Sequence, residues 1–181
     1  MSSDPWSDLD RLRAHVWDRL RRGADDADDA FRIVTLATVG ADGPQLRQVA
    51  LRAADPGVAV VEIHTDVRTA KVVELRADPR AQILLWDDAT REQLRLSARL
   101  DVVAADPARW ARVPNAARLN YGTDPAPGTP IPDPDALTRR ADVARFAALV
   151  GPVLRIDAVS LAHDPHRRAV LTPDAARWVA P

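Results

Sequence analysis

The sequence of 181 residues contains no cysteine. The chain therefore has no disulfide bond and offers no thiolate as a metal ligand or nucleophile. No apolar run approaches the roughly 20 residues that span a bilayer. The first residues, MSSDP, lack the basic and apolar regions of an export signal. These absences predict a cytoplasmic protein with no membrane partner.

Lysine is nearly absent, because only Lys71 among the 25 basic residues is a lysine. The formal net charge is −1, so no overall basic field attracts nucleic acid, and we expect no nucleic-acid partner. Apolar residues make up 46% and charged residues 28%, which is typical of a soluble globular protein. At this length the composition predicts a single domain over residues 1–181.

Motifs of several enzyme classes are also missing. The sequence has no GxxxxGK[ST] phosphate loop, no GxGxxG that opens a helix after a strand, and no GxSxG elbow. Its four histidines are His15, His64, His163 and His166. Only the last two have helical spacing, but Pro165 lies between them and no third ligand is near in sequence. We therefore predict no metal site.

Hydrophobic periodicity predicts a mainly β fold. Residues 6–22 have the apolar spacing of a helix, within an N-terminal helical region 1–23. Alternating or β-branched segments predict strands at 31–39, 46–53, 58–65, 81–86, 92–103, 153–161, 168–172 and 178–179. Further helices are predicted at 67–77, 107–113 and 135–150, and an irregular Pro- and Gly-rich loop at 120–134. The sum is an antiparallel barrel of five or six strands, with its core at 31–104 and peripheral helices.

A set of polar residues gathers at the ends of these predicted elements. Its members are Arg47, Arg52, His64, Thr65, Arg68, Thr69, Lys71 and Gln93. The start of a helix presents free backbone N–H groups, and the helix predicted at 67–77 begins inside this set. Hydroxyls, guanidinium groups and the only ammonium side chain add further donors. This pattern predicts a binding site for a phosphate.

Several runs of this sequence resemble the FMN-binding core of the pyridoxamine 5'-phosphate oxidase family. These runs are RQVALR (47–52), IHTDVRTAK (63–71), ELRADPR (74–80), LLW (84–86) and REQLRL (91–96). The resemblance covers about residues 31–104. It implies a split β-barrel and a homodimer whose two FMN sites lie at the subunit interface.

The resemblance also implies a role for individual residues. Arg47 and Lys71 would bind the FMN phosphate, Thr65 would bond near the phosphate or ribityl chain, and Gln93 would contact the polar edge of the ring. Asn115 falls near a position where the second subunit reaches the cofactor. The other residues of the implied FMN site are Gln48, Val49, Ala50, Leu51 and Arg52 along the ring, with His64, Arg68 and Thr69 near the phosphate.

The sequence departs from the family pattern at several positions. His64 stands where the family has another aromatic residue, and Ala70 replaces the first residue of a basic pair, so that Arg68 would substitute. The C-terminal run His166-Arg167-Arg168 does not reproduce the Arg-x-His motif of the oxidase proper, and Val170 replaces an expected Arg. The three residues 166–168 remain candidates for contact with a small-molecule substrate, and the substrate itself is unassigned.

Four interpretations stay open at this point. The first is an FMN-dependent oxidoreductase. The second is a flavin carrier or sensor without turnover. The third is a split barrel that holds haem or a deazaflavin, with His64 or His163 as axial ligand of a haem. The fourth is an interaction domain without a cofactor, which the ordered polar set argues against.

Overall fold

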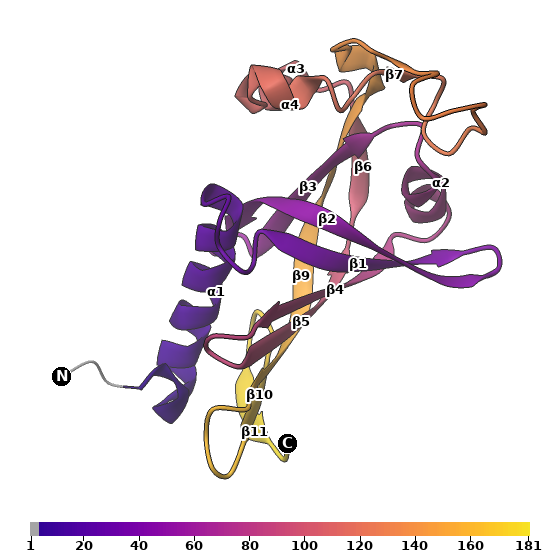
Figure 1. Ribbon diagram of the computed structural model, residues 1–181. Helices are drawn as coiled ribbons and strands as arrows, with labels where there is room; N and C mark the ends of the chain where they lie inside the picture. Colours follow the sequence, from indigo (N-terminus) through magenta and orange to yellow (C-terminus); the bar gives the residue numbers. More distant parts are fainter. Residues whose placement is uncertain (1–3) are drawn as a thin grey trace.

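The computed structural model describes residues 4–181 (Figure 1). Its elements in chain order are η1 (Pro5–Ser7), α1 (Leu9–Asp25), β1 (Ile33–Gly40), β2 (Gly43–Asp55), β3 (Val60–Asp66), α2 (Ala70–Ala77), β4 (Arg80–Asp87), β5 (Glu92–Arg99), β6 (Asp101–Ala104), α3 (Pro107–Arg112), α4 (Asn115–Arg118), β7 (Thr123–Asp124), β8 (Thr138–Arg139), η2 (Val143–Arg145), β9 (Phe146–Ser160), β10 (Arg167–Leu171) and β11 (Ala176–Val179). The mainly β fold class is confirmed.

The large sheet closes on itself as a barrel. Its strand order is β11-β10-β9-β3-β2-β1-β4-β5, and β5 also pairs with β9. The closed ring therefore consists of β9, β3, β2, β1, β4 and β5, which are antiparallel throughout. Strand β9 runs the length of the barrel, because its first half pairs with β3 and β6 and its second half with β5 and β10 (Figure 1).

Alternation of side chains decides which face of each strand lies in the core. In β4 and β5 every second residue is buried, as a strand with one solvent-facing side requires. Fully buried side chains from these strands and from β1 and β2 fill the barrel, among them Leu36, Leu51, Ile83, Leu85 and Leu96. Helix α1 covers one side of the barrel with Leu12, Val16 and Leu20 (Figure 1).

A buried polar group ties α1 to the turn between β4 and β5. Glu92 accepts hydrogen bonds from Trp6 Nε1 at 2.6 Å and from His15 Nε2 at 3.0 Å. Arg19 donates to Asp87 at 2.6 Å, and its guanidinium lies 4.4 Å from the centre of the Phe31 ring. Burial on its own would raise the pKa of Glu92, but the bonds from His15 and Trp6 lower that pKa below its usual value.

Substitution of Glu92 by glutamine should therefore destabilise the fold in a pH-dependent way. A carboxylate whose pKa is lowered by folding stabilises the native state above its unfolded pKa, and the contribution is lost as the pH falls through the folded value. We expect Glu92→Gln to lower the free energy of unfolding by about 2 kcal/mol at pH 7. Urea unfolding should show this difference shrinking below about pH 4. The exposed Asp101→Asn is the control, and equal losses in both variants would contradict the assignment.

The prediction of a helix at residues 135–150 is wrong. This segment contains β8, the short turn η2 and the first residues of β9, and Phe146, Ala147, Ala148 and Leu149 are fully buried strand residues. A continuous apolar run fits a buried helix and a strand buried on both faces equally well, so periodicity did not distinguish them. The predicted strand 92–103 is divided into β5 and β6 at Leu100. Helix α4 was not predicted.

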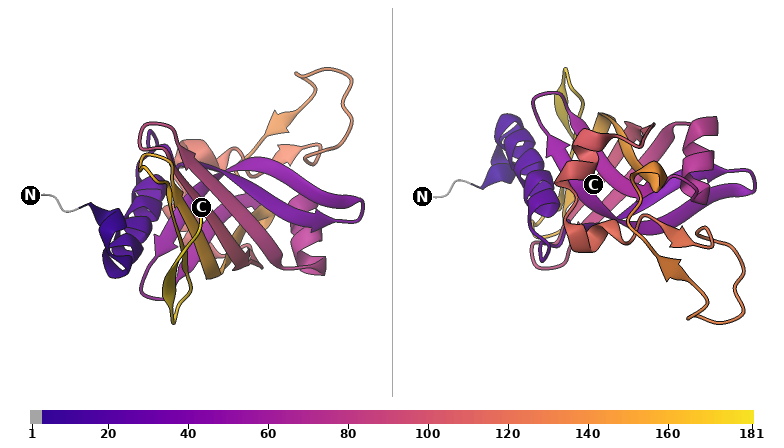
Figure 2. Two further views of the ribbon diagram at one scale, coloured as in Figure 1. Left: turned by 90° about the horizontal axis from the view of Figure 1, so that it is seen from below. Right: turned by 90° about the horizontal axis from the view of Figure 1, so that it is seen from above.

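The Pro- and Gly-rich segment projects from the barrel. Between α4 and β9 the chain leaves the barrel as an arm that is held at its base by the two-residue strands β7 and β8 (Figure 2). The irregular loop predicted at 120–134 lies in this arm, and only Thr123 and Asp124 of it are in a strand. Within residues 4–181, no helix combines the length and apolar character needed to cross a membrane.

Candidate functional site

Lys71 lies in the first turn of α2, where its ammonium group is surrounded by hydroxyls. Lys71 Nζ donates to Thr65 Oγ1 at 3.1 Å, and Thr65 Oγ1 lies 3.2 Å from Thr69 Oγ1. No carboxylate among residues 4–181 forms an ion pair with it. Burial lowers the pKa of Lys71, and the nearby Arg47 lowers it further. The carboxylates of Glu74 and Asp66 act in the opposite direction. The group is therefore a partly buried cation that donates to a hydroxyl and has no directly paired carboxylate among the described residues.

Arg47 reaches the same place from β2. The register of β1 and β2 places Arg47 opposite the core residue Leu36, so its side chain points to the inner face of the sheet. It donates to Thr38 Oγ1, to the Gln45 carbonyl oxygen at 3.2 Å and to Glu74 Oε2 at 2.8 Å. Two of its five N–H groups are thus without a partner among the described residues. Glu74, one turn after Lys71 on α2, holds this guanidinium near the ammonium.

The helix start supplies the remaining donors. Thr69 is the N-cap residue of α2, but its hydroxyl donates to the Asp66 carbonyl oxygen at 2.8 Å and caps no N–H group. The first N–H groups of a helix carry partial positive charge and favour an anion. We name Arg47, Thr65, Thr69 and Lys71 the α2 cluster. Two cations, two hydroxyls and a helix start form the donor set that a phosphate needs, so these residues fit the phosphate of FMN.

Arg68 does not point into the α2 cluster. Its Nε and Nη2 donate to the two carboxylate oxygens of Asp66 at 2.9 and 2.6 Å, and Nη2 also donates to the Thr123 carbonyl oxygen at 2.7 Å. The carboxylate of Asp66 raises the pKa of Arg68. Arg68 therefore anchors the base of the arm next to α2, which differs from the predicted substitution for the basic residue missing at Ala70.

Part of the predicted ring-binding set lies on the outer face of the sheet. The registers place Gln48 opposite Thr35, Ala50 opposite Ile33, and Gln93 opposite Trp86. Ile33 is 54% exposed and Trp86 is 41% exposed. Two large apolar side chains therefore lie on the same face of the sheet as Gln48 and Gln93. Val49 points inward, and Leu51 is fully buried, which leaves only its backbone for contact with a ligand.

Arg52 and His64 line a separate pocket of about 360 Å³, which we name the Arg52 pocket. Arg52 occupies the irregularity in the pairing of β2 with β3, between Leu51 and Ala53. His64 Nε2 lies 2.7 Å from Glu62 Oε1. The other residues at this pocket are Ala24, Asp25, Arg32, Ala53, Glu62, Arg112, Val113 and Pro114. Asn115 follows Pro114 at the start of α4.

The carboxylate of Glu62 lies among His64, Arg109 and Arg112. It accepts from Arg109 Nε at 3.0 Å, and Arg112 lies 3.7 Å away. Burial on its own would raise the pKa of Glu62, but His64 and Arg109 lower it below its usual value. Sequence reasoning did not select Glu62, although the two-residue spacing from His64 on a strand places both side chains on one face. Burial raises the pKa of Tyr121, whose ring packs on the same side of β3.

The C-terminal candidates meet at a third place. His166, Arg167 and Arg168 line a hollow of about 420 Å³ together with Trp6 and Trp178. Both arginines are bound to carboxylates, since Arg167 donates to Asp4 at 2.7 Å and Arg168 donates to Asp157 at 2.9 Å. In the same region, His163 Nδ1 lies 2.8 Å from Ser160 Oγ and His163 Nε2 lies 3.1 Å from Asp4. Neither nitrogen of His163 is therefore free to bind a haem iron.

The model of the pyridoxamine 5'-phosphate oxidase, FMN-binding domain family matches residues 14–104, just over half of the chain. The chain belongs to this family. The chain is 30% identical over 135 residues to pyridoxine/pyridoxamine 5'-phosphate oxidase 2 of Arabidopsis thaliana, covering 66% of this chain and 68% of that protein.

Two solved structures share the fold over the whole chain. A pyridoxamine 5'-phosphate oxidase-related, FMN-binding protein from Nostoc punctiforme has a TM-score of 0.77 and 26% identity, covering 100% of both chains. PhzG from Burkholderia lata, solved with tetrahydrophenazine-1-carboxylic acid, has a TM-score of 0.72 and 18% identity, covering 100% of this chain and 98% of that chain. The barrel is thus the split β-barrel of the pyridoxamine 5'-phosphate oxidase family.

Proposed function

We propose that this family member is an FMN-dependent oxidoreductase that works as a homodimer. The observation that carries the proposal is the α2 cluster, where the partly buried ammonium of Lys71 lies near Arg47 and donates to the hydroxyl of Thr65. The α2 cluster would hold the FMN phosphate, and Gln93 with the segment 48–52 would lie along the ring. Bound FMN supplies hydride-transfer chemistry, and the protein contributes binding, orientation and electrostatics.

The outer face of the sheet supports a dimer. Ile33 and Trp86 stand there beside Leu84, which is 40% exposed, and Leu46, which is 67% exposed. A contiguous exposed apolar surface on a soluble protein marks an interaction site. Gln93 belongs to this face, whereas Lys71 lies with α2 at the barrel end, so a second copy packed on the face would complete the cofactor site.

The Arg52 pocket supports an anionic substrate. Three arginines, Arg32, Arg52 and Arg112, line it with two carboxylates, Asp25 and Glu62. Burial lowers the pKa of Arg32, and the proximity of Arg52 lowers it further. A carboxylate or phosphate of the substrate would relieve this repulsion between cations. Because His64 Nε2 lies 2.7 Å from Glu62 Oε1, His64 Nδ1 is the ring nitrogen that would contact the substrate.

Removal of Arg52 should weaken the binding of an anionic probe. We expect Arg52→Ala to raise the dissociation constant of pyridoxal 5'-phosphate by at least tenfold, because a charge-assisted hydrogen bond contributes about 1.5–3 kcal/mol. Absorbance titration of the FMN-loaded protein measures this constant. The exposed Arg11 of α1 offers the control variant Arg11→Ala. If both variants bind the probe like the wild type, the Arg52 pocket is not the substrate site.

The visible spectrum of the purified protein tests the cofactor itself. Flavin absorption bands and release of a chromophore with the mass of FMN are the expected result, and a colourless protein that ignores added FMN would refute the proposal. A flavin carrier without turnover is the second candidate, because Arg167 and Arg168 are bound to carboxylates in the region of the altered C-terminal motif. A carrier would bind FMN but would show no catalytic turnover of the flavin between an electron donor and oxygen.

A further inference from the structure

The outer face of the sheet changes from mainly apolar on β1 and β4 to basic on β5 and β9. The exposed Leu84 of β4 lies opposite Arg95 of β5, and Arg95 lies opposite Asp157 of β9. In the neighbouring row, Ser97 lies opposite Arg155. The basic half is therefore continuous with the apolar half, which is proposed above as the dimer surface.

The basic half has more cations than carboxylates. Arg95 and Arg168 donate to Asp157 Oδ2 at 2.7 and 2.9 Å, and Arg155 lies 3.5 Å from the same oxygen. The Asp157 side chain is 3% exposed, whereas those of Arg95 and Arg155 are 50% and 45% exposed. Gln82, Arg95, Ser97, Arg155 and Asp157 line a pocket of about 280 Å³ here, which we name the Arg155 pocket. Three guanidinium groups that share one carboxylate favour a further anionic group at this pocket.

The arm carries the complementary charge. Its outer part, residues 125–137, which we name the arm tip, contains Asp133 and Asp135 but no lysine or arginine. Both aspartates are exposed, and the Asp133 carboxylate accepts from the backbone N–H of Asp135 within the tip. Among residues 4–181, no basic side chain forms an ion pair with either aspartate. The arm tip therefore presents two carboxylates to its surroundings.

Proline makes the arm tip stiff. Prolines stand at positions 125, 127, 130, 132 and 134. Each proline fixes its backbone angle φ, so the tip loses less conformational entropy when a partner surface orders it. Ile131 and Leu137 of the same tip are 37% and 38% exposed. A stiff segment with exposed apolar side chains is suited to docking on a protein surface.

The arm extends in the direction of the dimer surface. Both views in Figure 2 show the arm projecting past the barrel, on the same side as the β1–β2 hairpin. An isologous dimer places the outer faces of both copies against each other. An arm that projects on this side then lies alongside the partner protomer.

We propose that the arm tip docks on the partner protomer of the homodimer, with Asp133 and Asp135 at the partner's Arg155 pocket. This inference rests on the proposed dimer. The two carboxylates form charge-assisted hydrogen bonds with the surplus guanidinium groups, and Ile131 and Leu137 pack on the apolar part of the outer face. Each protomer contributes one tip and one pocket, so both contacts are equivalent and the assembly closes as a dimer.

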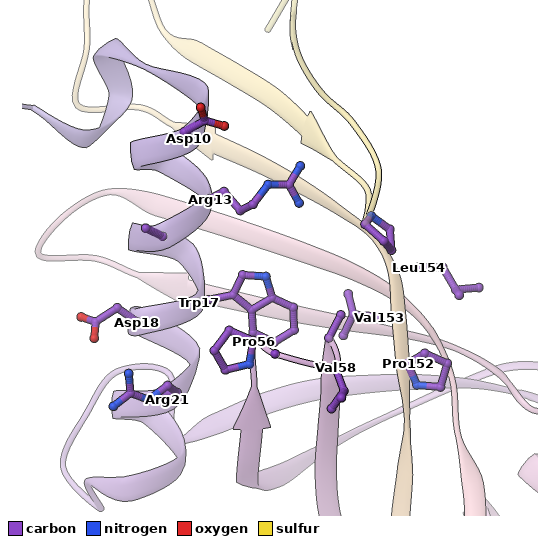
Figure 3. Close-up of a pocket in the computed structure, with 14 residues that line it drawn as sticks. Asp10, Arg13, Trp17, Asp18, Arg21, Pro56, Val58, Pro152, Val153 and Leu154 are labelled. Carbon is purple, nitrogen blue, oxygen red and sulfur yellow. The ribbon is translucent and has the colours of Figure 1, made fainter.

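Paired cysteine variants test this placement, because the chain has no cysteine of its own. FMN-loaded Ala136→Cys and Ser97→Cys proteins are mixed, allowed to exchange subunits and oxidised. A disulfide requires the two Cβ atoms to come within about 4.5 Å, so the docked tip should give a covalent dimer on a non-reducing gel. Val58→Cys replaces Ser97→Cys in the control mixture, because Val58 is 66% exposed but lies beside α1 (Figure 3). The control mixture should not crosslink.

Charge reversal tests the chemistry of the contact. Asp133→Arg combined with Asp135→Arg should raise the dimer dissociation constant, measured by sedimentation of the FMN-loaded protein, by about tenfold. Arg155→Asp should have a similar effect, and combining it with the arm variant should restore part of the lost affinity. Asp18→Arg is the control, because the exposed Asp18 of α1 points away from the barrel (Figure 3). It should leave the constant unchanged.

The possible failures are distinguishable. A dimer that gives no crosslink, and whose dissociation constant the arm variant does not change, would overturn the docking but leave the proposed dimer in place. If only Arg155→Asp weakens the dimer, the Arg155 pocket faces another part of the partner, and the docking is overturned as well. Sedimentation of the wild type at the mass of one chain would instead refute the proposed dimer itself. The flavin absorption of each variant reports separately on the cofactor site.

Discussion

Lys71→Ala should raise the dissociation constant of FMN by about 100-fold and leave that of riboflavin almost unchanged. Riboflavin lacks the phosphate, so only FMN uses the ammonium group beside Arg47 and Thr65. A partly buried charge-assisted bond contributes up to about 3 kcal/mol, and each 1.4 kcal/mol is roughly a factor of ten in affinity. Quenching of flavin fluorescence during titration of the apoprotein measures both constants.

The control for this experiment is Arg76→Ala on the same helix, because Arg76 is exposed. Arg47→Ala should resemble Lys71→Ala but also destabilise the protein, since it leaves the carboxylate of Glu74 without its guanidinium partner. Equal losses for FMN and riboflavin in Lys71→Ala would show that this residue does not bind the phosphate. The α2 cluster would then lose its assigned role, although the family and the fold would stand.

The lowered pKa of Lys71 gives the same site a pH signature. Burial and Arg47 favour the neutral amine, so the free protein loses this charge at a lower pH than an ordinary lysine does. FMN affinity should therefore fall as the pH rises, beginning below the usual titration range of lysine near 10.4. Lys71→Arg should remove this dependence, because a guanidinium stays protonated throughout.

The second large effect is expected at the outer face of the sheet. Trp86→Asp should convert the proposed dimer into a monomer. In an isologous interface each subunit contributes the same residues, so the variant removes two indole side chains from the interface and places two carboxylates there. Light scattering should show the mass of one chain in place of two. FMN affinity should fall in the same variant if the partner completes the site.

Trp178→Asp is the matched control for Trp86→Asp. The two indoles are 43% and 41% exposed, but the register of β10 and β11 pairs Trp178 with the buried Ala169, so Trp178 lies on the opposite side of the sheet from the outer face. This variant should remain a dimer. A dimer that survives Trp86→Asp would place the interface elsewhere, and a monomer in both variants would indicate general unfolding.

The sequence by itself determined the fold class and predicted the local part of the candidate site. Apolar and polar residues alternate along β4 and β5, and turn residues separate the strands. This pattern predicts an antiparallel sheet with one face buried and one face in solvent, because side chains along a strand point to alternate faces. Thr65, Thr69 and Lys71 lie within seven residues, so the junction of β3 and α2 brings them together without help from the rest of the chain. Local chemistry was enough to predict an anion site there.

Only the tertiary structure decided which distant residues lie near the α2 cluster's local residues. Arg47 reaches Lys71 because β2 pairs with β1 in a register that points its side chain inward, and Glu74 then fixes it. The same pairing sends Gln48 and Ala50 outward, to the face that carries Gln93. Likewise, residues 146–150 became a strand because β3 and β6 flank them on both sides. Register and pairing partners depend on the whole barrel, and local periodicity carries no information about them.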